Sequence, residues 1–253
     1  MTAIACQMDL MHTRAIHSWL GSILLTCRYE SDESSQTSSV AETWLRKGLA
    51  MININKYESA LKFFSQAIEL KPDCSEAYIM KGVVLGRLGL CNEATKCYDK
   101  AIELVPNSPH AWHVKGATLS SLGRHAQALI CYDEALKFDP NNTQVWLAKA
   151  FSLENLNDFG GAIKCYEEVL KQKPDYAKAW YLMSLVQIGS SSFKAALNSL
   201  DKALESKVDF VEALLGKSIV LDKLGRTSEA ESCKKRAMEM KNMPESMSSS
   251  DAR

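Results

Sequence analysis

Residues 109 to 142 read PHAWHVKGATLSSLGRHAQALICYDEALKFDPNN, and the same 34-residue pattern returns along most of the chain. Six copies follow one another without insertion or deletion, beginning at Ala41, Ser75, Pro109, Thr143, Ala177 and Val211. Self-similarity at a period of about 20 to 50 residues indicates a repeat architecture, in which each copy is one supersecondary element. The period therefore restricts the fold class before any single helix is considered.

Four positions of the repeat have a constant size or chemistry. The fourth is bulky and apolar: Trp44, Tyr78, Trp112, Trp146, Trp180 and Leu214. The eighth is small: Gly48, Gly82, Gly116, Ala150, Ser184 and Ser218. The twentieth is always alanine: Ala60, Ala94, Ala128, Ala162, Ala196 and Ala230. The twenty-fourth is aromatic in the first four repeats, which also end on Pro72, Pro106, Pro140 and Pro174. Small residues at two fixed places predict two elements that approach each other closely.

Each repeat contains two windows with apolar side chains at helical spacing, so two helices per repeat are expected. Leu-Gly pairs at Gly89, Gly123 and Gly225 predict the end of the first helix, because glycine tolerates the left-handed conformation found there. Gly189 comes two residues early in the fifth repeat, which predicts an irregular turn over residues 189–192. One repeat cannot bury its apolar face alone, so the repeats must stack.

The order Trp, Gly, Ala, aromatic and Pro within 34 residues resembles the tetratricopeptide repeat family over residues 41–244. The resemblance implies an all-α fold, a right-handed superhelical solenoid of six antiparallel helix pairs. The pairs would cover residues 41–74, 75–108, 109–142, 143–176, 177–210 and 211–244. It also implies a non-enzymatic scaffold or adaptor that binds a peptide or helix of a partner protein in a concave groove.

The two ends differ from the repeats. Met8, Met11, Ala15, Trp19 and Ile23 lie at helical spacing, which predicts an amphipathic helix within an apolar N-terminal segment, residues 1–27. A helix packed on the first repeat, a loose segment and peripheral membrane attachment remain alternatives for it. A serine-rich acidic stretch, residues 28–40, is expected to be a flexible linker, and residues 245–253 a disordered tail.

Composition excludes several classes of function. With 30 Lys and Arg against 30 Asp and Glu, the formal net charge is zero, so no basic footprint for nucleic acid is present. Eight cysteines in a long, regular chain favour a reducing compartment, and we expect a cytoplasmic protein. His110 and His113 share a helix face but lack a third ligand, so neither a metal nor a cofactor is expected. No nucleophile with an adjacent base is evident, and we predict no enzymatic activity.

The family resemblance also suggests where a partner would bind, because the first helix of each repeat lines the groove. Those positions predict the following binding residues: Leu45, Leu49, Ile79, Val83, His113, Leu147, Phe151, Tyr181, Leu185 and Leu215. The surface is mainly apolar, which suits a protein segment. Packing between repeats uses the same positions, so both roles remain open. Leu147, Phe151 and Tyr181 are expected to form one pocket. The chaperone carboxylate clamp is absent, since Leu45, Met80 and His110 stand at its positions.

The seventh position carries a row of cations, Lys47, Lys81, Lys115, Lys149 and Lys217, interrupted by Met183. The row would either bind acidic ligands or pair locally with acids such as Asp133 and Asp201. The neutral net charge favours local pairing. The leading hypothesis is therefore an adaptor that recognises partner proteins through its groove. The alternative is a membrane-peripheral assembly factor attached through its N-terminal segment.

Overall fold

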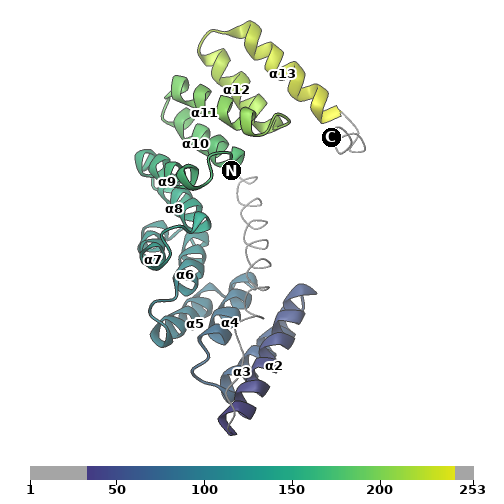
Figure 1. Cartoon of the computed structure of the whole chain (residues 1–253), viewed down its shortest axis with the longest axis vertical. Helices are drawn as coiled ribbons and strands as arrows, with labels where there is room; N and C mark the ends of the chain where they lie inside the picture. Colours follow the sequence, from purple (N-terminus) through teal and green to yellow (C-terminus); the bar gives the residue numbers. More distant parts are fainter. Residues whose placement is uncertain (1–32, 243–253) are drawn as a thin grey trace. The chain divides into compact units, whose positions relative to one another are not determined.

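The computed structural model describes residues 33–242, which form twelve helices and no strand (Figure 1). The helices are α2 (Glu33–Asn53), α3 (Tyr57–Leu70), α4 (Ser75–Arg87), α5 (Cys91–Leu104), α6 (Pro109–Ser121), α7 (His125–Phe138), α8 (Thr143–Asn155), α9 (Phe159–Gln172), α10 (Ala177–Gly189), α11 (Phe193–Ser206), α12 (Val211–Lys223) and α13 (Thr227–Asn242). Two helices per repeat, as the periodicity predicts, are present in all six repeats.

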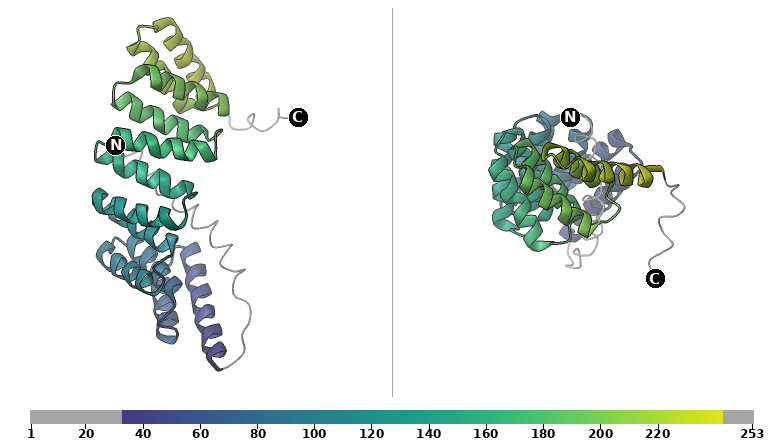
Figure 2. Two further views of the ribbon diagram at one scale, coloured as in Figure 1. Left: turned by 60° about the vertical axis from the view of Figure 1, so that its left-hand side comes forward. Right: turned by 90° about the horizontal axis from the view of Figure 1, so that it is seen from above.

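The chain divides into two compact units, which meet within α6: unit 1 ends at Val114 and unit 2 begins at Lys115. In unit 1, α2 packs against α3, α3 against α4, and α4 against α5. In unit 2, each helix from α7 to α13 packs against the next, and α10 also contacts α12 (Figure 2). Each unit is thus a stack of antiparallel helix pairs, the fold that the repeat predicts.

Close packing within each pair explains the small residues. The six alanines at the twentieth position are fully buried, with 0% of their surface exposed. A Cβ atom placed on Gly48 would lie 2.5 Å from the Phe64 ring, and one on Gly116 would lie 2.7 Å from the Tyr132 ring. Carbon atoms do not approach this closely without displacement. The ring at the twenty-fourth position therefore lies directly on the backbone of its paired helix, which only a very small residue permits.

The turn between paired helices has one geometry throughout. At the fifteenth position φ is positive in every repeat: Asn55 56°, Gly89 78°, Gly123 73°, Asn157 59°, Ser191 58° and Gly225 77°. The prediction of an irregular turn at residues 189–192 is wrong. The Ser192 N–H donates to the Gln187 carbonyl at 2.7 Å, as the Leu90 N–H does to Leu85 at 2.9 Å. Packing of the pair fixes this turn, and Ser191 adopts the left-handed conformation at a cost of about 1 kcal/mol.

The prediction of a flexible linker over residues 28–40 is also wrong in part, because α2 begins at Glu33 and residues 33–40 are helical. No Pro or Gly separates them from the first repeat, and extending an existing helix adds one hydrogen bond per residue fixed. Lys71, which directly follows α3, donates a hydrogen bond to the Ser38 hydroxyl at 3.5 Å. The predicted segment at residues 1–27 and the predicted tail at residues 245–253 lie outside the described residues.

Candidate functional site

The first helices of the last three repeats, α8, α10 and α12, carry the same pattern along one side. Positions two, five, nine and twelve are spaced by three, four and three residues, so they share one helix face. The middle two positions hold Leu147, Phe151, Tyr181, Leu185, Leu215 and Ile219. The outer two hold Gln144, Glu154, Lys178, Ile188, Glu212 and Asp222. These twelve residues are the unit 2 groove face, an apolar band with mainly polar edges.

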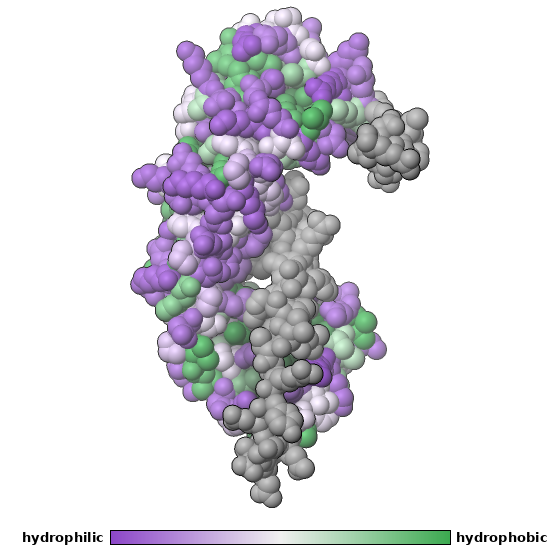
Figure 3. All heavy atoms as spheres, viewed as in Figure 1, coloured by the Kyte–Doolittle hydropathy of each residue, from purple (hydrophilic) through white to green (hydrophobic). Residues whose placement is uncertain are grey.

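Solvent exposure of the apolar band increases from α8 to α12. Leu147 is buried, whereas Phe151, Tyr181 and Leu185 are half-buried. Leu215 and Ile219 are 42% and 52% exposed. Apolar surface is visible over α12 in Figure 3, beside polar side chains, whereas polar side chains dominate over α9. The band is therefore most accessible at α12, the first helix of the last repeat.

Two aromatic residues of the band contact different neighbouring elements. The Phe151 ring meets the His125 ring of α7 edge-on, with centroids 6.1 Å apart. The Tyr181 ring packs against Phe210, just before α12, with centroids 5.1 Å apart. The Phe151 ring thus contributes to packing between consecutive repeats, and the Tyr181 ring packs against the loop that precedes α12, while part of each ring remains exposed. The single pocket expected for Leu147, Phe151 and Tyr181 stays a prediction.

The candidate residues of unit 1 lie in a different environment. Leu45, Leu49, Ile79 and Val83 are 4 to 9% exposed and belong to one hydrophobic cluster with the fully packed ring of Phe64. His113 is half-buried. In unit 1, four of the five predicted binding residues are thus packing residues.

The second groove position is half-buried in unit 1. Burial lowers the pKa of His110 from 6.5 to about 4, because a buried imidazolium is poorly solvated. Burial raises the pKa of Glu76, and the negative charge of Glu42 raises it further. In the part of the chain that the structure describes, no three His, Cys, Asp or Glu side chains come together in a way that could hold a metal ion.

One contact within the repeats, between positions twelve and twenty-four, was not predicted from the sequence. Position twelve of the first helix meets position twenty-four of the second helix in the same repeat. In the fourth repeat the Tyr166 hydroxyl donates to Glu154 Oε1 at 2.5 Å. In the sixth, Lys234 pairs with Asp222 at 2.7 Å. In the first and fifth repeats both positions are apolar, Ile52 with Phe64 and Ile188 with Leu200. Residues of matching chemistry twelve positions apart could therefore have predicted this contact from the sequence.

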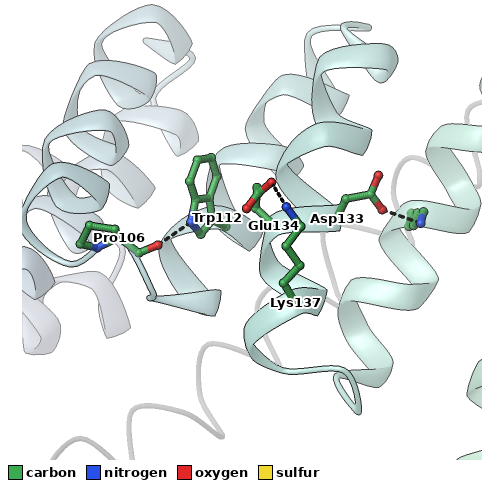
Figure 4. A network of polar contacts seen from close by, with 6 residues as sticks. Pro106, Trp112, Asp133, Glu134 and Lys137 are labelled. Atoms are coloured by element: carbon green, nitrogen blue, oxygen red, sulfur yellow. Dashed lines mark hydrogen bonds and ion pairs between the residues drawn. The ribbon is translucent and has the colours of Figure 1, made fainter.

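The fourth-position tryptophans have a hydrogen bond that the family pattern did not suggest. The indole N–H of Trp112 donates to the carbonyl of Pro106 at 2.9 Å (Figure 4). The corresponding bonds join Trp146 to Pro140 at 2.8 Å and Trp180 to Pro174 at 2.7 Å. Each bond ties the loop that ends one repeat to the first helix of the next.

Two lysines of the cation row form local ion pairs. Lys149 lies 2.6 Å from Asp133 (Figure 4), and Lys217 lies 2.6 Å from Asp201. Each acid occupies position twenty-five of the preceding repeat, so the pairs connect neighbouring repeats. Lys47 instead lies over the Trp44 ring, 4.2 Å from its centroid. For Lys149 and Lys217 the structure agrees with local pairing.

Sequence models of the tetratricopeptide repeat match residues 41–74, 75–108, 109–142 and 143–186. The chain is a tetratricopeptide repeat protein. The first three matches have the repeat boundaries inferred from the sequence, and the fourth begins at the inferred boundary. Beyond residue 186, α10 to α13 continue the same pairing of helices.

Solved structures of low sequence identity share the fold. Pseudomonas aeruginosa pilF is 15% identical with a TM-score of 0.67, over 81% of this chain and 93% of that chain. PilW, a type IV pilus biogenesis factor, is 18% identical with a TM-score of 0.67, over 81% and 96%. YrrB, described as a TPR protein with an unusual peptide-binding site, is 23% identical with a TM-score of 0.59, over 72% and 96%. No curated protein sequence matches. At these identities the likeness establishes the fold alone.

Proposed function

We propose that this tetratricopeptide repeat protein is a non-enzymatic scaffold that binds a peptide or helix of a partner protein on the unit 2 groove face. The observation that carries the proposal is the apolar band repeated on α8, α10 and α12, whose last members Leu215 and Ile219 are 42% and 52% exposed. Two large aliphatic side chains four residues apart on one helix form a continuous apolar stripe. Such a stripe with a polar edge suits the apolar face of a partner segment.

Exposure on the unit 2 groove face reduces the set of predicted binding residues. The unit 2 groove face retains Phe151, Tyr181, Leu185 and Leu215 as binding candidates, whereas Leu147 is buried like the unit 1 residues, and it adds Ile219, which is not among the binding residues predicted from the sequence. YrrB, which shares the fold, is described as having a peptide-binding site, and this supports the same class of ligand. The proposal requires no cofactor, metal or catalytic group. Cytoplasmic localisation remains a prediction.

The membrane-peripheral alternative depends on the N-terminal segment, which lies outside the described residues. Across residues 33–242, no helix is both long and apolar enough to cross a membrane. The groove proposal, in contrast, rests on described side chains.

Two exposed isoleucines provide a matched test. Ile219 belongs to the unit 2 groove face, whereas Ile130 lies on α7, the second helix of its repeat, and is 63% exposed. A photo-crosslinking residue at either position of the full chain would identify proteins that contact it in cells, and titration calorimetry with the purified partner would give its Kd. We expect Ile219→Lys to weaken binding at least about tenfold and Ile130→Lys to leave it unchanged. Equal crosslinking at both positions, or equal affinity of both variants, would contradict the proposal.

A further inference from the structure

Glu154 is an acidic group at the edge of an apolar surface. It occupies position twelve of α8, one turn beyond Phe151 on the same helix face. Its side chain is half-buried, and burial raises the pKa of the carboxyl, while the hydrogen bond from Tyr166 partly lowers it. Removing a carboxylate from water is costly unless an opposite charge and hydrogen bonds replace the solvent. Glu154 therefore occupies a position where a charge partner would be strongly favourable.

The described residues supply one hydrogen bond to this carboxylate but no opposite charge. Oε1 accepts the Tyr166 hydroxyl at 2.5 Å, and no lysine or arginine between residues 33 and 242 pairs with Glu154. Within residues 33–242 the hydrogen bond to this carboxylate is made at Oε1, and the Glu154 side chain is only half-buried. A carboxylate oxygen can accept further N–H donors while its other oxygen is already bonded. Glu154 can thus accept a donor from outside the chain.

The same position in the sixth repeat shows a neutralised acid. Asp222 pairs with Lys234 at 2.7 Å, whereas the residue corresponding to Lys234 in the fourth repeat is Tyr166. A neutral hydroxyl satisfies one hydrogen bond but leaves the negative charge uncompensated. Lys149, on the same helix as Glu154, is paired with Asp133. At position twelve, the unit 2 groove face thus has an uncompensated negative charge on α8 and a neutralised one on α12.

We propose that Glu154 selects the bound segment by pairing with a lysine or arginine that lies about one helical turn from apolar side chains packed on Phe151. This inference rests on the proposed function and specifies its partner: an amphipathic segment with a cation at the border of its apolar face. A charge-assisted hydrogen bond to Oε2 would compensate the charge of Glu154, and its partly desolvated surroundings strengthen the pair. A segment with an uncharged or acidic residue at that place would leave the charge of Glu154 uncompensated. Glu154 would therefore both strengthen the binding of cationic segments and disfavour the others.

The test uses a phage-displayed library of random linear peptides selected on the full-length protein and, in parallel, on its Glu154→Gln variant. Glutamine keeps an oxygen that can accept the Tyr166 hydroxyl but removes the charge. We expect peptides selected on the natural protein to be enriched in Lys or Arg next to apolar residues, and those selected on Glu154→Gln to lose the cation. Asp222→Asn is the matched control, because Asp222 already has Lys234, and its selection should keep the cation.

A second arm changes the peptide as well as the protein. In one selected peptide, arginine is replaced by citrulline, which keeps the shape but not the charge, and both peptides are titrated against the natural protein and Glu154→Gln. We expect each single change to weaken binding by about tenfold or more, and the second change to add little to the first. Thermal melts verify that Glu154→Gln is folded; if it is not, the citrulline comparison on the natural protein decides.

Two negative outcomes have different meanings. Peptides that bind the natural protein, lose affinity for Ile219→Lys and show no preference for a cation would overturn the role of Glu154 and leave the groove proposal standing. A selection that yields no peptide sensitive to Ile219→Lys would overturn the groove proposal and this inference with it.

Discussion

Two isoleucines on the groove-side faces of the two units have opposite surroundings. Ile79 on α4 in unit 1 is 4% exposed and belongs to a hydrophobic cluster, whereas Ile219 on α12 in unit 2 is 52% exposed. Both lie on the groove-side face of a first helix. The repeat register therefore tells which face of a helix carries a side chain, but not whether that face is covered. Coverage depends on which elements pack against that helix.

The second groove position repeats the contrast. His110 in unit 1 is half-buried, and desolvation lowers its pKa to about 4, whereas Glu212 on α12 is exposed. Unit 1 uses much of its groove-side surface for packing, and unit 2 leaves more of it accessible. Mutations at matched positions should therefore change stability in unit 1 and binding in unit 2.

The largest expected effect is on the free energy of unfolding. Ile79→Ala removes buried methyl groups and should destabilise the protein by about 2 to 5 kcal/mol. Ile219→Ala removes the same atoms from an exposed position and should change stability by less than about 0.5 kcal/mol. Urea denaturation followed by circular dichroism measures both. Similar losses for the two variants would show that the units do not differ in this way.

A pH series tests the second position. Since the folded-state pKa of His110 is about 4 and the unfolded value is 6.5, the unfolded chain binds more protons between these values. This contribution to stability is full above pH 6.5 and is lost as the pH falls toward 4, by about 2 kcal/mol at pH 5.

His110→Gln should remove this acid sensitivity, so the melting temperatures of variant and natural protein should diverge between pH 7.5 and pH 5. Glutamine is the residue at the same position in the fourth repeat, Gln144. The control is His125→Gln in unit 2, since the His125 ring is less buried and its pKa is less strongly lowered. A pH dependence unchanged by His110→Gln would mean that the imidazole is not excluded from water.

The smallest expected effect compares two turns of the same geometry. A Cβ on Gly89 would meet no atom within 4 Å, so Gly89→Ser in unit 1 introduces only the strain of a positive φ, about 1 kcal/mol. Ser191→Gly in unit 2 removes that strain, which should raise stability by about 0.5 to 1 kcal/mol. The greater flexibility of glycine in the unfolded chain reduces this gain. Opposite shifts in melting temperature are expected, and shifts of the same sign would indicate that the two turns are held differently.

The repeat pattern predicted the helix pairs because buried positions with a constant size leave a periodic trace. Ala128 and its equivalents are fully buried, and the rings of Phe64 and Tyr132 face glycines of the paired helix. The positive φ of Ser191 was missed because glycine was taken as the only marker of that turn. Residues 33–40 were read as a linker from their serines, although serine lowers helix stability only modestly when a strong helix continues beyond it.

The candidate binding surface was less predictable than the fold. The repeat register placed the candidates on one face of each first helix, and five of the ten lie on the unit 2 groove face. It did not distinguish Ile79 from Leu215, because both are aliphatic residues at the fifth position and only the surrounding elements decide their exposure. The role proposed for Glu154 depends on the residue twelve positions later, a relationship between two helices that single positions do not reveal.

The tryptophan hydrogen bonds make individual loops observable in solution. Trp112, Trp146 and Trp180 each bond the carbonyl of the proline that ends the preceding repeat, so each indole senses whether that loop remains in place. Indole emission shifts when the N–H exchanges a protein acceptor for water. Leaving one of these three tryptophans at a time, with the chain's other tryptophans replaced, would turn the protein into a set of site-specific fluorescent reporters. Local opening of successive repeats could then be followed without an added dye.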